Sequence, residues 1–158
     1  MRLWKHGPMT TMPSAANVAL VSCHYEEFLN QGDMSAADRH LRPDFVDHAA
    51  PPGTPPGPES SKEFITMVRS AFSDIRVTEE EVIANGDMVA VSGLWQGTHE
   101  GPFFGLEPTG RFGEMRGMVL WRVVEGQLAE RWAVLDYDAL FGALQDDRQP
   151  SSLASAGR

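Results

Sequence analysis

The sequence predicts an α+β fold in which a strongly curved, mixed or antiparallel sheet wraps over N-terminal helices. Apolar residues recur at helical spacing in the stretches 14–31 and 60–72. Turn dipeptides at 85–86 (Asn-Gly) and 125–126 (Glu-Gly) each separate two runs rich in β-branched and aromatic residues. Helices that precede successive long strands gather on one face of the sheet, and its twist leaves a cone-shaped hollow over them.

The first half of the chain is mainly helical. Ser14 can cap a helix that runs to about Gln31, with Gly32 just past its end. A short helix at 36–41 and a short strand at 45–49 follow. The Pro-rich stretch Pro51 to Gly57 is a stiff surface loop or lid, because proline cannot donate to a central sheet.

The second half consists mainly of strands. Ser60 and Glu63 form a capping box that opens a helix with an apolar stripe ending at Phe72. Strands are then expected at 75–84 and 88–98. A turn-rich loop at 97–110 leads into a hairpin over 111–136, and 137–144 is a final short helix.

The hairpin at 111–136 contains the main functional clue. With a two-residue loop at 125–126, Val124 pairs with Gln127 and the ladder places Met115 opposite Asp136. One face then combines apolar side chains, a glycine that leaves room and a single far carboxylate: Met115, Gly117, Val119, Trp121, Trp132, Val134 and Asp136.

Length and composition limit the possible functions. The 158 residues suit one domain, expected at 14–145 between a flexible leader (1–13) and a disordered tail (146–158). A net charge of −9 argues against nucleic acid and anionic membranes as partners. The single Cys23 excludes an intrachain disulfide and a multi-cysteine metal site. No run of apolar residues suits a membrane span or a secretory signal, so a cytoplasmic protein without metal or organic cofactor is expected.

Several segments, in this order along residues 14–145, resemble the SnoaL-like polyketide cyclases, also labelled ester cyclases, of the nuclear transport factor 2-like superfamily. They are PDFVDHAAPPG (43–53), RSAFSDI (69–75), IANGDMVAV (83–91), GTHEGPFFGLEPTGR (97–111) and WRVVEGQLAERWAVLDYDAL (121–140).

The resemblance implies a cone-shaped α+β barrel, a homodimer formed through the outer sheet face and no cofactor. It also implies an enzyme of secondary metabolism, such as antibiotic biosynthesis, that closes a polyketide ring by intramolecular aldol condensation. In such cyclases an Asp at the end of the last long strand is the general acid and base, and Asp136 holds that position here. The sequence carries Gly117 and Val119 where those cyclases place Gln and His.

The chemistry expected of Asp136 is proton transfer at a bound carbonyl compound. One carboxylate can remove the proton alpha to a carbonyl and later protonate the new alkoxide, provided that desolvation raises its pKa. Asp136 also precedes a helix, so it can equally be an N-cap.

Other residues are candidates for the lining of the site. Because side chains alternate along a strand, only one of Asp47 and His48 can point inward, and an inward His48 could share a proton. His99 is expected to hold the long loop or to touch ligand. Phe103 and Phe104 could cover the mouth of the cone or be buried anchors of the loop. Tyr25 lies on the inward helix stripe, where its hydroxyl could meet ligand or be satisfied within the core.

Three functions remain open at this point. The first is a cyclase or isomerase-type tailoring enzyme acting on an apolar, polyketide-like carbonyl compound through Asp136. The second is a non-catalytic binding or carrier protein that uses the same hollow, which the residues at 117 and 119 favour. The third is an epoxide-opening or hydroxylating relative, a reaction that needs several polar groups around one water.

Overall fold

The structure, a computed structural model, describes residues 14–148; the expected leader and most of the expected tail lie outside this range. Helix α1 (Ser14–His24) continues directly into the π-helical segment η1 (Tyr25–Asn30). The remaining elements are α2 (Met34–His40), β1 (Leu41–Asp47), α3 (Pro58–Ala71), β2 (Arg76–Asn85), β3 (Met88–Thr98), β4 (Phe112–Val124), β5 (Gln127–Leu135) and α4 (Tyr137–Gln145).

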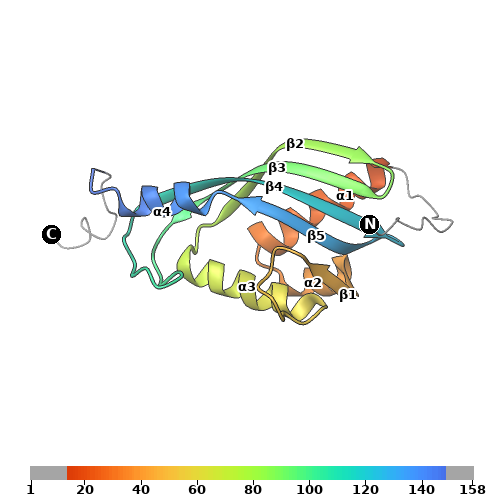
Figure 1. The fold of residues 1–158 in the computed structure, drawn as a ribbon, viewed down its shortest axis with the longest axis horizontal. Helices are drawn as coiled ribbons and strands as arrows, with labels where there is room; N and C mark the ends of the chain where they lie inside the picture. Colours follow the sequence, from red (N-terminus) through yellow and green to blue (C-terminus); the bar gives the residue numbers. More distant parts are fainter. Residues whose placement is uncertain (1–13, 149–158) are drawn as a thin grey trace.

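The five strands form one sheet in the order β1-β5-β4-β3-β2. β1 pairs with β5 in parallel, and the other neighbours are antiparallel, so the sheet is mixed. The long strands curve over α1, α2 and α3, which all lie on the same side of the sheet, while α4 lies at one end (Figure 1). The α+β prediction is confirmed; the sheet is curved and does not close on itself.

Local sequence explains most of the boundaries. The helix expected over 14–31 is present, but its last part widens: the Gln31 amide donates to the Glu26 carbonyl five residues earlier, at 2.9 Å. Asp33 accepts a hydrogen bond from the Ser35 amide and so starts α2 two residues earlier than predicted. β1 contains Pro43, which is tolerated because β1 is an edge strand.

The start of α3 differs from the predicted capping box. The helix begins at Pro58, whose preset φ and missing amide hydrogen suit the first helical position. Gly57 precedes it with a φ of +105°. Because glycine has no side chain, it makes no side-chain capping hydrogen bond. Ser60 therefore lies inside the helix, where its hydroxyl donates to the carbonyl of Pro55 at 3.2 Å.

The β4–β5 hairpin contains a bulge that the sequence analysis missed. Val123 pairs with Leu128, but Arg122 pairs with Glu130, so Ala129 is the extra residue. Because side chains alternate, this one-residue shift moves every later β5 side chain to the opposite face of the sheet. The predicted pairing of Met115 with Asp136 is wrong: the Asp136 amide bonds to the Arg116 carbonyl at 3.0 Å.

The bulge changes which residues share a face. Met115, Val119 and Trp121 do point toward the helices and are buried, as predicted. Their cross-strand neighbours on that face are Ala133 and Leu135, whereas Trp132 and Val134 point to the outer face, where Val134 is 78% exposed. Gly117 leaves no room for a carboxylate, because a Cβ there would lie 2.3 Å from Cδ2 of Leu135.

The core fills one half of the hollow with aromatic side chains. Trp121 of β4 packs edge-on against Tyr25 and His24 and stacks on Phe45, with ring centroids 5.3–6.2 Å apart. Phe28 lies against His24 on the helix side. Aromatic side chains therefore fill this half of the cone, and a pocket lies at the other half, toward α4. None of the described helices is both long and apolar enough to span a bilayer.

Candidate functional site

A pocket opens between α3, α4 and the sheet. Its volume is about 410 Å³ when the mouth that opens to solvent is included, and the enclosed part is much smaller. The lining residues come from α3 and the segment after it, from facing parts of β3 and β4, and from the β5–α4 junction: Phe64, Val68, Phe72, Ile75, Trp95, Gln96, Gly97, Phe103, Gly113, Met115, Leu135, Tyr137 and Leu140. The lining is almost entirely apolar, which is typical of sites for apolar small molecules.

Gly113 sets the position of α4 at the end of the pocket. A Cβ at this position would lie 2.6 Å from Cδ1 of Leu140 and 2.9 Å from Cδ2 of Leu144. The absence of a side chain on β4 thus allows α4 to pack directly on the strand. Leu140, Leu144 and the adjoining Phe141 hold the helix against the sheet.

The loop between β3 and β4 forms another side of the pocket. The amides of Glu100 and Gly101 both donate to the carbonyl of Ala71, at 2.8 and 3.1 Å, which ties the loop to the end of α3. This holds Phe103 edge-on against Phe72, with ring centroids 5.2 Å apart, and both rings line the pocket. Phe104 follows in a left-handed conformation (φ +45°) and is 60% exposed.

Few polar groups line the pocket. Among the lining side chains, Trp95 and Tyr137 carry a polar group, an indole N–H and a phenol. The Gln96 side chain alternates to the outer face of the sheet, where its Nε2 donates to Glu114 Oε2 at 3.5 Å. Tyr137 is partly buried, and burial raises the pKa of its hydroxyl, so it stays protonated and can donate a hydrogen bond. Tyr137 also faces Phe104 edge-on at 6.0 Å, so the phenol lies beside the exposed loop aromatic.

Asp136 lies at the rim of the pocket and not on its lining. It is exposed, and its Oδ1 accepts the Ala139 amide at 3.0 Å, so it caps α4. The expectation of a desolvated carboxylate among Met115, Trp132 and Val134 is wrong, because the Ala129 bulge turns that part of β5 over. Its sequence neighbours Leu135 and Tyr137 both line the pocket, whereas Asp136 does not.

His48 is not on the inner face. Its Nε2 lies 2.8 Å from Glu130 Oε2, and its ring stacks on Trp132 at 4.6 Å with an interplanar angle of 4°. The side chains of His48 and Trp132 therefore lie on the outer face of the sheet. The expectation that His48 points inward is wrong. Asp47 has the opposite orientation, and its carboxylate accepts a hydrogen bond from Arg131 at 2.8 Å. It does not line the pocket.

Other candidates lie in the core. Tyr25 is 4% exposed, and its hydroxyl accepts a hydrogen bond from Trp121 Nε1 at 3.3 Å; burial raises the pKa of Tyr25 to about 12. Val119 and Trp121 are buried in the same region and do not line the pocket. Tyr25 thus packs in the core with its hydroxyl satisfied, and none of these three residues lines the pocket.

His99 anchors the loop. It is fully buried, it stacks on Phe72, and its Nδ1 accepts a hydrogen bond from the Thr109 amide at 3.3 Å. Burial lowers the pKa of His99. The Phe72 side chain separates it from the pocket, so His99 shapes the site without lining it.

The structure thus brings together only part of the predicted lining. Phe103 and Met115 line the pocket, Phe104 lies against the lining residue Tyr137, and Asp136 adjoins two lining residues in sequence without lining the pocket itself. The sequence analysis missed the contribution of Phe64 and Val68. Their apolar stripe was recognised as buried, but nothing in that stripe distinguishes packing on the sheet from packing around a space. Among the described residues, donor atoms close enough to share a metal ion occur in one group, Cys23, Glu27 and His40, away from the pocket.

Comparison with known proteins assigns the chain to a family. The sequence profile of the SnoaL-like polyketide cyclases matches residues 19–144. The chain therefore belongs to the SnoaL-like polyketide cyclase family, and the resemblance found in the sequence is confirmed.

Among particular relatives, the chain is 26% identical over 119 residues to nogalonic acid methyl ester cyclase from Streptomyces nogalater, covering 74% of this chain and 89% of the relative. It is 29% identical to IdmH from Streptomyces antibioticus, a proposed polyketide cyclase; the TM-score is 0.71 over 81% of this chain and 97% of that one. AclR from Streptomyces galilaeus, a proposed hydroxylase, is 25% identical with a TM-score of 0.73, covering 84% and 97% of the two chains.

Proposed function

We propose that this protein is a cyclase-type enzyme that closes a ring in an apolar, polyketide-like carbonyl compound. The observation that carries the proposal is the apolar pocket between α3, α4 and the sheet, in a chain of this family with a cyclase among its relatives. A pocket of this kind favours a folded conformer of a flexible apolar substrate, because extended conformers leave more apolar surface in water.

The polar groups at the mouth suit carbonyl chemistry. The Tyr137 hydroxyl can donate to a carbonyl oxygen and orient it. Asp136 is the acid/base in this proposal. Its Oδ1 caps α4, while its Oδ2 makes no hydrogen bond to any described residue and remains accessible for a proton. It removes the proton alpha to one carbonyl, the carbanion attacks a second carbonyl, and the proton returns to the new alkoxide.

The enclosed part of the pocket is small, so a multi-ring substrate requires the mouth to widen. Phe104 is exposed on the β3–β4 loop, and its left-handed backbone places it outside the contacts that hold Glu100 and Gly101 to the end of α3. We propose that this loop moves outward for substrate entry and then returns to exclude water from the rim.

The substitution Asp136→Asn tests the acid/base role. Asparagine is as good an N-cap as aspartate, so α4 and substrate affinity should be retained. Turnover should fall by at least about 100-fold, because the amide cannot accept and return the proton. The assay would measure kcat and KM on polyketide intermediates of the kind used by the cyclase relatives.

Asp138→Asn is the matched control. Asp138 is exposed in the first turn of the same helix and does not line the pocket, so the control removes an equal charge two residues away. Wild-type turnover in this variant is expected. If Asp136→Asn also kept wild-type turnover, Asp136 would have no role in the reaction.

A binding protein without catalysis is the second candidate. It is favoured by the absence of carboxylate and imidazole groups among the described lining residues. It predicts that a bound polyketide is recovered chemically unchanged after long incubation, whereas the enzyme converts it in many cycles. Mass spectrometry of the recovered ligand separates the two candidates.

We also propose a homodimer formed through the outer sheet face. Four apolar side chains lie there on the paired strands β4 and β5, in two adjacent cross-strand pairs: Met118 with Val134, and Leu120 with Trp132. Met118 and Val134 are 64% and 78% exposed, and an apolar sheet face of this kind suits a partner. The helices cover only the other face of the sheet (Figure 1).

A further inference from the structure

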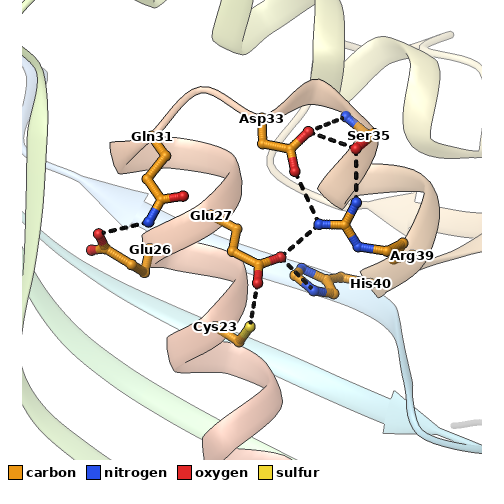
Figure 2. Close-up of polar contacts among 8 residues, drawn as sticks. All are labelled: Cys23, Glu26, Glu27, Gln31, Asp33, Ser35, Arg39 and His40. Carbon is orange, nitrogen blue, oxygen red and sulfur yellow. Dashed lines mark hydrogen bonds and ion pairs between the residues drawn. The ribbon is translucent and has the colours of Figure 1, made fainter.

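A group of metal-ligating side chains lies on the helical layer, apart from the pocket. Cys23 at the end of α1, Glu27 in η1 and His40 at the end of α2 each present one ligand atom, and these atoms all lie within 4.8 Å of one another (Figure 2). We propose that these three residues bind a divalent transition-metal ion, with Zn²⁺ as the preferred ion.

The backbone brings the three donors to one place. Cys23 and Glu27 are four residues apart on one continuous helical segment, a spacing that puts two ligands on the same face. The chain then turns at Gly32, whose φ of +73° is a left-handed conformation, and α2 runs back so that His40 faces Glu27. The Cys23 thiol lies 3.2 Å from Glu27 Oε1, and His40 Nε2 lies 3.4 Å from Glu27 Oε2.

The donor set selects the class of ion. Thiolate, carboxylate and neutral imidazole together carry two negative charges, which balance a divalent cation. Sulfur and imidazole nitrogen suit Zn²⁺ and similar transition metals, whereas Mg²⁺ and Ca²⁺ prefer oxygen ligands alone. Three protein ligands leave a fourth tetrahedral position, and the partly exposed Cys23 and Glu27 give solvent access to it.

His40 presents Nε2 to the cluster from a buried position. The residue is 8% exposed, and its Nδ1 is buried without a hydrogen-bond partner among the described residues. Nδ1 and Nε2 point away from each other on the ring, so the ion would bind through Nε2, the nitrogen that faces Glu27.

Arg39 competes with the metal for Glu27. Its Nη2 lies 2.7 Å from Glu27 Oε2 and 3.0 Å from Asp33 Oδ2, and its Nη1 donates to the Ser35 hydroxyl at 2.7 Å. Figure 2 shows this guanidinium between Glu27 and Asp33. When the ion binds, the Arg39 guanidinium loses its contact with Glu27 and retains its contacts with Asp33 and Ser35. The Cys23 thiol releases its proton to water.

Cobalt titration of the full chain tests the proposal. Co²⁺ in the site should produce a thiolate-to-cobalt charge-transfer band that saturates at one ion per chain, and Zn²⁺ should displace it. Cys23→Ser should abolish this band and weaken Zn²⁺ binding by at least about tenfold. Arg39→Gln should have the opposite effect and strengthen Zn²⁺ binding, because it removes the competing cation.

His48→Gln is the control, because it removes an exposed imidazole on the outer sheet face, away from the cluster. It should leave the band and the Zn²⁺ affinity unchanged. Circular dichroism of Cys23→Ser checks that the fold is intact. Unchanged metal binding in folded Cys23→Ser, or no saturable binding in the wild type, would overturn the proposal. Neither result bears on the cyclase function, since the pocket shares no residue with the cluster.

Discussion

His24 shows how a single buried residue makes stability depend on pH. It is 2% exposed between Phe28, His40 and Trp121, and burial lowers its pKa from 6.5 to about 3. The folded protein therefore keeps His24 neutral down to about pH 3, whereas the unfolded chain binds a proton near pH 6.5. Unfolding takes up a proton between these values, so the free energy of unfolding falls as pH falls below about 6.5.

We expect His24 to lower the free energy of unfolding by about 2 kcal/mol between pH 7 and pH 5. His24→Phe should remove this part of the pH dependence, because phenylalanine fits an aromatic cluster and has no proton to bind. Urea unfolding curves at several pH values provide the measurement.

Tyr25→Phe is the control for this experiment. It removes the hydrogen bond from Trp121 Nε1 in the same cluster but no group that titrates between pH 5 and pH 7. It should lower stability at every pH and keep the wild-type slope. An undiminished slope in His24→Phe would show that other groups cause the acid destabilisation.

At the scale of elements, the bulge at Ala129 decides which face of β5 meets the core. Deleting Ala129 would restore the regular register and turn Trp132 and Val134 inward while Leu135 turned outward. We expect this deletion variant to lose cooperative thermal unfolding. Near-ultraviolet circular dichroism, which reports on the packing of Trp121 and Trp132, gives the measurement.

Ala129→Ser keeps the extra residue and serves as the control, and it should fold like the wild type. A cooperative transition in the deletion variant at the wild-type temperature would show that the hairpin accepts either register.

The contact between the β3–β4 loop and α3 is the second element that we predict to be sensitive. A Cβ at Gly101 would lie 2.3 Å from the Ser70 carbonyl oxygen and 3.0 Å from the Ala71 Cα, and neither backbone atom can move freely. Gly101→Ala should therefore cost about 1–3 kcal/mol of stability, with a Tm lower by about 2–4 °C for each kcal/mol. It should also loosen Phe103 and weaken ligand binding in the pocket.

Gly142→Ala gives a matched comparison. A Cβ there meets no atom within 4 Å, and alanine favours the helical conformation of α4. This variant should be as stable as the wild type or more so by about 1 kcal/mol. Equal losses in both variants would mean that the loop contact contributes nothing.

At the scale of the whole molecule, the two faces of the sheet have different roles. The inner face packs on helices at one half and borders the pocket at the other, while the outer face carries the apolar pairs proposed as a dimer contact. Val134→Lys should convert a dimer into a monomer, because it places a charge at the centre of that contact. Sedimentation velocity measures the change.

Thr66→Lys adds the same charge on the exposed side of α3, away from the outer sheet face, and should leave the oligomeric state unchanged. A wild-type protein that sediments as a monomer at all concentrations would contradict the proposed dimer.

Local patterns in the sequence were sufficient to predict most helices and strands and to recognise the family. Glu125-Gly126 forms the predicted tight turn, and β3 begins and ends at the predicted residues 88–98. The other hairpin turn is one residue later than predicted, at Gly86 and Asp87, because Asn85 pairs with Met88. Helical periodicity identified α1 and α3 because burial on one side imposes that pattern wherever the partner lies. Ser60 and Glu63 misplaced the start of α3 because a proline at the first helical position is the stronger signal.

The functional site was harder to predict from the sequence, because its position depends on the pairing of strands that are distant in the chain. Alternation predicts which β5 residues share a face, but it does not say which face meets the core, and one bulge reverses the answer for Trp132, Val134 and Asp136. The sequence by itself determined the α+β order, the turns and the family. Only the tertiary structure decided that aromatic rings fill one half of the cone and that a pocket remains at the other. That outcome arises from packing among distant side chains, which no local pattern records.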